Sequence, residues 1–197
     1  MDCLSLFRSL LLSLVILISL QLIFFLCGSS SAVVGVEKTN AAVIVKDLVH
    51  DICVQTSNPV LCDNTLRPRR IPMPGNFSKL AEIVLLYTSN RASTNRMDID
   101  SYLDNETDPN MRKQLFVCAD CYDLVNEDMF KCEEALSQAR FVDLFNYAVI
   151  AKGNEVQCEL GFAASGAVEP PQLVTTSKLF QDYADILRVI AKTAAGT

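Results

Sequence analysis

Apolar residues recur along the chain with helical spacing. From Met111 onward they alternate at intervals of four and three residues, which is the stripe of a long amphipathic helix. The stripe comprises Met111, Leu115, Cys118, Tyr122, Val125, Met129, Cys132 and Leu136. Asp108 is placed to cap this helix, and Pro109 fits its first turn, where a missing N–H costs nothing. We therefore predict one long helix over this stretch.

The same spacing predicts three further long helices. One begins near Asn76, a suitable N-cap, and 98–103 either continues it or forms its own turn before a break at 104–108. Its apolar face holds Phe77, Leu80, Ala81, Val84 and Thr88. Another covers 141–162, with Phe141, Leu144, Phe145, Ala148, Ala151, Cys158 and Phe162 inside. The last runs from about Gln172 to Ala195, and Gly196 suits its C-terminal cap. One line of it holds Leu173, Ser177, Phe180, Ala184, Leu187 and Ala191, and beside that line lie Leu179, Tyr183, Ile186 and Ile190.

The connections between these helices are short. We place a reversal at 138–140, although no Gly or Pro marks it, and one helix running straight through is the competing interpretation. Residues 165–171 form a loop. Upstream, 40–66 holds a short helical hairpin, and 67–75 is a Pro-rich linker. Long helices with short connections pack most simply as an all-α, up-and-down four-helix bundle, here with an N-terminal α-helical hairpin.

The first 32 residues have the layout of a secretory signal. Arg8 supplies the basic n-region, 10–26 is almost wholly apolar, and small residues precede a cleavage site after Ala32. A membrane anchor is the alternative, but the apolar run is shorter than the about 20 residues that span a bilayer comfortably. We predict a cleaved signal over 1–32, a domain over 40–195, and a secreted protein that has no membrane association after cleavage.

The chain is acidic, with 17 Lys and Arg against 23 Asp and Glu and a net charge of −6. The predicted leader contains one residue of each sign, so cleavage leaves the charge unchanged. This charge argues against nucleic acid as a partner and suits a basic protein. The basic cluster Arg67, Arg69 and Arg70 is interpreted as a solvated loop. Asn76 and Asn105 head N-glycosylation sequons, which would fit a secreted glycoprotein.

Six cysteines remain after the predicted leader: Cys53, Cys62, Cys118, Cys121, Cys132 and Cys158. An even number in a secreted chain suggests disulfides, and a Cys53–Cys62 bridge would close the short hairpin. Cys121 and Cys132 lie about 16 Å apart along one helix, too far to pair.

Cys158 has two candidate partners on the preceding helix. Helical register slightly prefers Cys121, whereas position on the buried stripe prefers Cys118. We choose Cys118, which leaves Cys121 and Cys132 as candidate free thiols.

Catalytic motifs are missing from the sequence. It has no nucleophile elbow, no paired-histidine zinc motif and no phosphate or dinucleotide loop, and its single histidine, His50, is interpreted as an ordinary helix residue. Cys118 and Cys121 have redox spacing but lie inside a predicted helix. We therefore predict a binding protein with no cofactor or metal, and not an enzyme.

Two cysteine motifs resemble those of the plant invertase and pectin methylesterase inhibitor family. The first is Cys53-x2-Thr56-x5-Cys62-x3-Leu66 after an apolar helix. In the second, Tyr122 follows Cys118 by four residues, and Phe162 follows Cys158 by four. The resemblance spans roughly 40–195, nearly the whole predicted mature chain.

The resemblance implies a four-helix bundle with an N-terminal helical hairpin, and the bridges Cys53–Cys62 and Cys118–Cys158. It also implies an apoplastic, cell-wall or vacuolar protein that covers the cleft of a carbohydrate-active enzyme in a 1:1 complex. Invertase inhibitors of the family carry Pro-Lys-Phe at the turn before the third bundle helix, where this chain has Ala139-Arg140-Phe141. The basic and aromatic pair Arg140 and Phe141 is therefore a candidate target contact, but the proline is missing.

Three functions follow as hypotheses. The lead hypothesis is a secreted inhibitor of pectin methylesterase, favoured by the resemblance and by the acidic charge. The second is an inhibitor of cell-wall or vacuolar invertase, favoured by Arg140 and Phe141. The third is a non-inhibitory helical ligand or carrier, because bundles host many unrelated functions.

Overall fold

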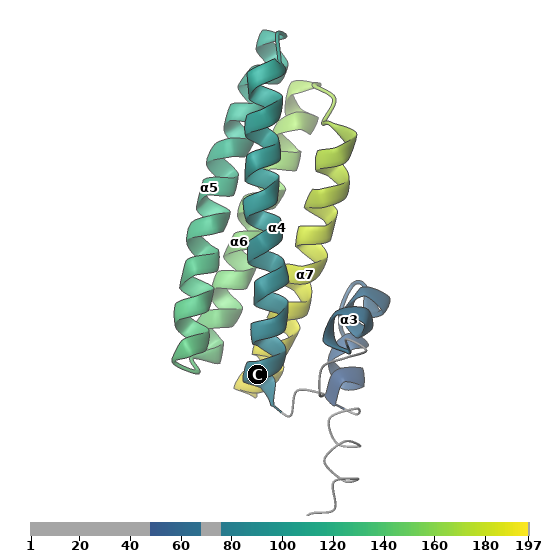
Figure 1. Ribbon diagram of the computed structural model, residues 1–197, viewed down its shortest axis with the longest axis vertical. Helices are drawn as coiled ribbons and strands as arrows, with labels where there is room; N and C mark the ends of the chain where they lie inside the picture. Colours follow the sequence, from purple (N-terminus) through teal and green to yellow (C-terminus); the bar gives the residue numbers. More distant parts are fainter. Residues whose placement is uncertain (1–47, 68–75, 197) are drawn as a thin grey trace, which may run out of the picture. The chain divides into compact units, whose positions relative to one another are not determined.

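Residues 48–67 and 76–196 are described by a computed structural model, and all their regular secondary structure is helical (Figure 1). The long helices are α4 (Phe77–Asn105), α5 (Pro109–Ser137), α6 (Phe141–Ser165) and α7 (Pro171–Ala195). Each packs against two neighbours, α4 and α6 both lying between α5 and α7. The predicted up-and-down four-helix bundle is confirmed. The predicted signal and the linker residues 68–75 lie outside the described residues, as do 40–47 of the domain.

Caps set the ends of the bundle helices. The Asn76 side chain accepts a hydrogen bond from the N–H of Lys79, and Asp108 accepts from the N–H groups of Asn110 and Met111. Gly166 and Gly196, both in the left-handed region, end α6 and α7. Of the two alternatives for 98–103, the structure has the continuous helix, and α4 extends to Asn105, into the predicted break at 104–108. The predicted end of α6 at 162 was wrong, because this helix continues to 165, whereas α7 begins at Pro171, close to the predicted start near Gln172.

The reversal between α5 and α6 forms without glycine or proline. Ala139 adopts a φ of 53°, its N–H donates to the carbonyl of Leu136, and the N–H of Arg140 donates to that of Ala135 at 2.8 Å. This hydrogen-bond pattern is a Schellman motif, which satisfies the last carbonyls of α5. An alanine in the left-handed region costs on the order of 1 kcal/mol. The straight-through helix that competed with this reversal is therefore wrong.

The bundle core is filled by side chains of all four helices. Of the predicted stripe on α5, the central members from Leu115 to Cys132 are buried, whereas Met111 and Leu136 at its ends are half-buried. Tyr122 is fully buried, meets the ring of Phe180 edge to face at 6.2 Å, and forms hydrogen bonds with Asn95 and Ser177. These contacts tie α4 and α7 to the middle of α5.

Two disulfides crosslink the described residues. Cys118 of α5 joins Cys158 of α6 with 4.5 Å between the Cα atoms, and Cys53 joins Cys62 with 5.4 Å between theirs. These are the pairings that the family resemblance implies. Cys121 is half-buried and Cys132 buried, and both are free thiols.

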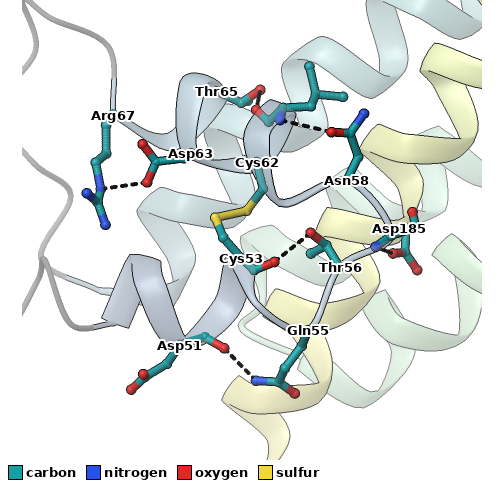
Figure 2. The surroundings of a disulfide bond; sticks show 12 residues. Asp51, Cys53, Gln55, Thr56, Asn58, Cys62, Asp63, Thr65, Arg67 and Asp185 are labelled. Atoms are coloured by element: carbon teal, nitrogen blue, oxygen red, sulfur yellow. Dashed lines mark hydrogen bonds and ion pairs between the residues drawn. A yellow bond between two sulfur atoms is a disulfide. The ribbon is translucent and has the colours of Figure 1, made fainter.

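The N-terminal hairpin consists of helical residues 48–53, a turn, and α3 (Pro59–Leu66). The Cys53–Cys62 bridge closes it, and Thr56 donates to the carbonyl of Cys53 at 2.8 Å (Figure 2). Asn58 caps α3 by accepting from the N–H of Leu61. The hairpin thus has its own local hydrogen bonds besides the crosslink.

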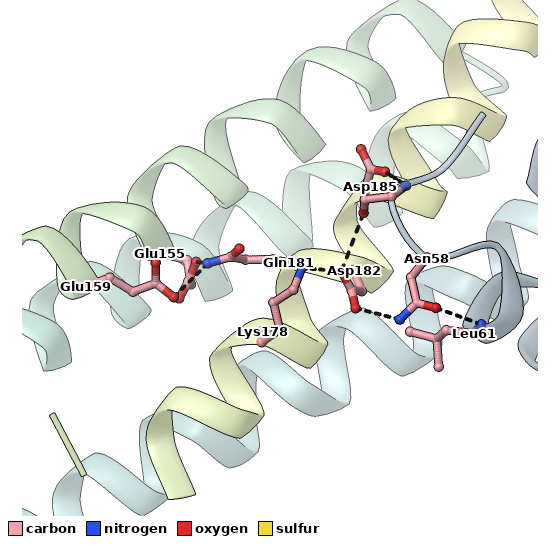
Figure 3. A network of polar contacts seen from close by, with 9 residues as sticks. Asn58, Leu61, Glu155, Glu159, Lys178, Gln181, Asp182 and Asp185 are labelled. Carbon is pink, nitrogen blue, oxygen red and sulfur yellow. Dashed lines mark hydrogen bonds and ion pairs between the residues drawn. The ribbon is translucent and has the colours of Figure 1, made fainter. Parts of the chain in front are cut away.

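Two aspartates of α7 hold the hairpin turn against the bundle. Asp185 accepts from the N–H of Ser57 at 2.8 Å, and Asp182 accepts from Asn58 at 2.9 Å and pairs with Lys178 at 2.6 Å (Figure 3). Burial favours a raised pKa for Asp185, but the Ser57 N–H and the Arg188 guanidinium together hold that pKa below its usual value. The charged form of Asp185 therefore stabilises the docked hairpin.

In the described ranges no helix combines the length and apolar character needed to cross a lipid bilayer.

Loss of each disulfide should lower stability according to the length of chain that it closes. The Cys118–Cys158 bridge spans 40 residues of sequence and the Cys53–Cys62 bridge 9. The loop-entropy estimate gives about 4 kcal/mol for the first and about 2.5 kcal/mol for the second. We expect the C118A/C158A and C53A/C62A variants to lose unfolding free energy in that order, measured by denaturant titration.

The half-buried thiol provides the matched control. C121A removes a sulfur from the same helix without breaking a crosslink, and we expect a loss below about 1 kcal/mol. A C121A loss as large as that of C118A/C158A would contradict the structural role given to the bridge.

Candidate functional site

A row of exposed apolar side chains runs along the outer side of α5 and α6. Val117 and Leu124 on α5 are 38% and 51% exposed, and Ile150 and Leu160 on α6 are 49% and 53% exposed. Half-buried Cys121 lies between the two α5 positions at helical spacing. We call these five residues the α5/α6 face. Exposed apolar side chains that gather on one face are typical of protein-binding surfaces.

The register between the helices brings the two halves of this face together. The Cys118–Cys158 bridge fixes this register. A second contact agrees with it: two to three turns along α5, Asn154 donates a hydrogen bond to buried Asp128 at 2.9 Å. Gly161 lies so close to α5 that a Cβ there would be 2.8 Å from the Gln114 side chain. The disulfide and the Asn154–Asp128 hydrogen bond therefore hold together the helix pair that carries the α5/α6 face.

Negative charge surrounds the face on α5. Between Asp120 and Ser137 this helix carries six carboxylates and one lysine, Lys131. Lys131 pairs with Glu127 at 2.9 Å and with Asp128 at 3.1 Å. Arg96 pairs with Asp123 at 2.7 Å and Arg140 with Glu134 at 3.5 Å, so these three cations neutralise part of the charge. An apolar row with an acidic margin suits a protein partner that carries basic groups around an apolar patch.

The predicted target contacts Arg140 and Phe141 lie at the turn between α5 and α6. The Arg140 guanidinium pairs with Asp143 at 2.6 Å and with Glu134 at 3.5 Å, and its side chain is 41% exposed. Phe141 is half-buried against the core. The turn and the end of α7 line a hollow of about 440 Å³. Arg140 is therefore held in place by carboxylates, and a partner would have to compete with them.

The two sequon asparagines lie at opposite ends of α4. Asn76 caps its first turn, and Asn105 is its last residue. A 29-residue helix is about 43 Å long. Both side chains are exposed, so either position could hold a glycan.

Neither free thiol has the surroundings of a reactive cysteine. Burial, and then the charge of Asp120, raises the pKa of Cys121. Burial raises the pKa of Cys132 to about 12. Both thiols stay protonated at ordinary pH, which makes them poor nucleophiles and poor metal ligands. Among the described residues, no group of His, Cys, Asp and Glu side chains is arranged to hold a metal ion.

Glu155 is a buried carboxyl that the sequence analysis did not single out. It is fully buried on α6, and Gln181 of α7 donates to its Oε2 at 2.7 Å and to Glu159 at 2.8 Å (Figure 3). Its Oε1 has no hydrogen-bond partner. Burial, then the charge of Glu159, raises the pKa of Glu155 to about 8, although the hydrogen bonds from Gln181 and Ser177 oppose that shift.

A second carboxyl, Glu169 in the loop after α6, titrates nearby. Burial, followed by the charge of Glu159, raises its pKa to about 7. Glu169 also has one oxygen without a partner. Glu155 and Glu169 thus hold protons into the neutral range beside Glu159, and this affects the pH dependence of bundle stability.

Comparison with known proteins matches most of the chain to one family of inhibitors. The family described as plant invertase/pectin methylesterase inhibitor matches residues 47–189. No curated protein matches the chain. One solved structure with the same fold is a mutant form of a pectin methylesterase inhibitor from Arabidopsis. It is 22% identical with a TM-score of 0.66, covering 73% of this chain and 95% of that one.

A second solved structure, a pectin methylesterase inhibitor from Arabidopsis thaliana, is 23% identical with a TM-score of 0.58. The match covers 74% of this chain and 95% of that one. At these identities the two structures support the fold alone.

The raised pKa of Glu155 predicts that stability falls as pH rises. An unfolded glutamate loses its proton near pH 4.5, whereas folded Glu155 keeps it to about pH 8. The folded state therefore binds more protons between these values, and the contribution is complete below about pH 4.5 and lost as pH passes about 8. Neutral E155Q should match the wild type at pH 4.5 and exceed it at pH 8 by on the order of 1 kcal/mol or more.

Thermal and denaturant unfolding across this range would measure the effect. E127Q, which changes an exposed glutamate of α5, is the control and should leave the pH slope unchanged. In E155Q the unfolding free energy should still fall with pH, but less steeply than in the wild type, because Glu169 also has a raised pKa. If the unfolding free energy of E155Q falls with pH as steeply as that of the wild type, Glu155 does not carry the proton that the folded state keeps to about pH 8.

Proposed function

The chain belongs to the plant invertase/pectin methylesterase inhibitor family, whose members are inhibitors and not enzymes, and on that premise we propose that it inhibits pectin methylesterase. The family match over 47–189 is the observation that carries the proposal. The two Arabidopsis structures that share the fold are described as inhibitors of this enzyme. The net charge of −6 suits a basic enzyme as target.

We place the contact with the enzyme on the α5/α6 face. Its apolar side chains are exposed, and the disulfide and the Asn154–Asp128 hydrogen bond join the two helices. A rigid surface loses little conformational entropy when it binds. In this proposal one inhibitor covers the active-site cleft of one enzyme molecule, and carboxylates of α5 steer the encounter.

Export accompanies this function. We propose that residues 1–32 direct the chain into the secretory pathway and are cleaved, and that 40–195 act as the inhibitor domain in the apoplast or cell wall. A vacuolar destination is the alternative and belongs with the invertase hypothesis. The carrier hypothesis loses support because side chains such as Tyr122 and Phe180 fill the middle of the bundle.

Titration of the purified mature protein against pectin methylesterase and against invertase tests the proposal. We expect pectin methylesterase activity to fall to near zero at about equimolar inhibitor, because one inhibitor molecule blocks the active-site cleft of one enzyme molecule. The assay should run from acidic to neutral pH. Full activity of both enzymes with a severalfold excess of inhibitor would refute the proposed function.

A charge at the centre of the α5/α6 face should weaken inhibition. L124D puts an unpaired carboxylate into the contact, and we expect the inhibition constant for pectin methylesterase to rise at least about tenfold. M97D changes an exposed apolar residue on α4, 63% exposed, and should leave the constant unchanged. Equal effects of the two variants would place the contact elsewhere.

Invertase is the second candidate target because of Arg140 and Phe141 at the α5–α6 turn. The ion pairs of Arg140 are on the surface and contribute little to stability, so R140A should fold normally. If invertase is the target, R140A should raise the inhibition constant for invertase about tenfold or more, measured in the same titration. An unchanged constant would exclude the turn as the invertase contact.

A further inference from the structure

An apolar groove runs between the first turns of α4 and the last turns of α5. Its volume is about 480 Å³, within the range of sites that hold small molecules. Leu85, Leu86 and Leu136 supply its apolar lining, and Leu86 is 62% exposed. Lys79, Glu82 and Ser137 are among its polar lining side chains. A lining of both kinds suits a sugar ring, whose C–H face is apolar and whose edge carries hydroxyl groups.

Asn76 lines this groove and also heads a sequon. Its Oδ1 accepts from the N–H of Lys79 at 2.9 Å and caps α4. Its Nδ2 makes no hydrogen bond in the described part of the chain. The atom that accepts a glycan is therefore separate from the atom that caps the helix, so a sugar can be added without loss of the cap.

We propose that Asn76 carries an N-linked glycan whose first sugar lies in this groove, on Leu85, Leu86 and Leu136. In the transfer, Nδ2 bonds to the anomeric carbon of a lipid-diphosphate-linked oligosaccharide. The bond from that carbon to the phosphate oxygen breaks, the lipid diphosphate leaves, and Nδ2 loses one proton. Ser78 supplies the hydroxyl that the sequon requires. The proposal rests on the export part of the proposed function.

The glycan would cover the α4/α5 edge and leave the α5/α6 face open. Asn105 differs from Asn76, because its Nδ2 already donates to the carbonyl of Ser101 at 2.7 Å. Because the glycan at Asn76 lies away from the α5/α6 face, its removal should change the stability of the protein and leave inhibition of pectin methylesterase unaltered. The inhibition titration on the same material reports separately on the proposed function.

Glycopeptide mass spectrometry of the full chain, produced in cultured plant cells, tests occupancy. We expect most wild-type molecules to carry a glycan at Asn76. S78A keeps the Asn76 cap and should lose the glycan, whereas S78T keeps the sequon and should retain it. N76D is a second glycan-free variant with a good helix cap. A wild-type chain with bare Asn76, whether exported or retained in the cell, would overturn the proposal.

Enzymatic removal of the sugar tests its place in the groove. An amidase that hydrolyses the Cγ–Nδ2 amide bond of the glycosylated asparagine releases the sugar as a glycosylamine and leaves aspartate, which still caps α4. We expect the melting temperature of the wild type to fall by about 2–4 °C on this treatment. L86S should keep its glycan but show a much smaller fall, and M97S, an exposed residue elsewhere on α4, should behave as the wild type does. Equal falls in wild type and L86S would overturn the groove placement.

Discussion

The covalent register between α5 and α6 is the constraint on which the rest of the structure depends. With Cys118 and Cys158 joined at 4.5 Å between Cα atoms, the two helices cannot slide by a turn. This register places Asn154 beside Asp128 and Gly161 against Gln114. It also gives a reason for an alanine in the left-handed region at position 139, because the chain must reverse within three residues. The same register fixes which exposed apolar residues of α5 and α6 lie at the same height along the pair.

Buried polar groups specify how the remaining helices meet this pair. Tyr122 reaches Asn95 of α4 and Ser177 of α7 in the core, so a shift of either helix would leave a buried hydroxyl or amide unpaired. Asp182 and Asp185 specify the position of the hairpin in the same way, because they would lose their hydrogen bonds if it moved. Such groups add less stability than apolar packing would, but they penalise misplaced helices. Glu155 extends this pattern at a cost: its proton removes the penalty of burying a charge, but its Oε1 still has no hydrogen-bond partner.

The apolar spacing predicted the helices, and their short connections predicted the bundle. The reversal at 138–140 was an inference from geometry, because its Schellman motif uses Ala139 where glycine is usual. The sequence held a signal for Glu155 that went unused: it continues the inner line from Ala151 to Cys158 at spacings of four and three. A charged residue on such a line is normally assigned to the surface, so only packing reveals that it is buried. Asp182 and Asp185 gave no signal, because their partners in the hairpin are more than 120 residues away.

An inhibitor binds more tightly when the side chains and helices of its binding surface are already ordered before it meets the enzyme. The Cys118–Cys158 disulfide and the buried hydrogen bonds of Tyr122 order the bundle during folding, which lowers the conformational entropy that the α5/α6 face would lose on binding. Charge has the complementary role: carboxylates of α5 act over several ångströms and raise the rate of encounter, whereas the apolar row acts on contact and slows dissociation. Salt screens the α5 carboxylates but not the apolar contact at Leu124. Added salt should therefore lower the association rate and change the dissociation rate much less.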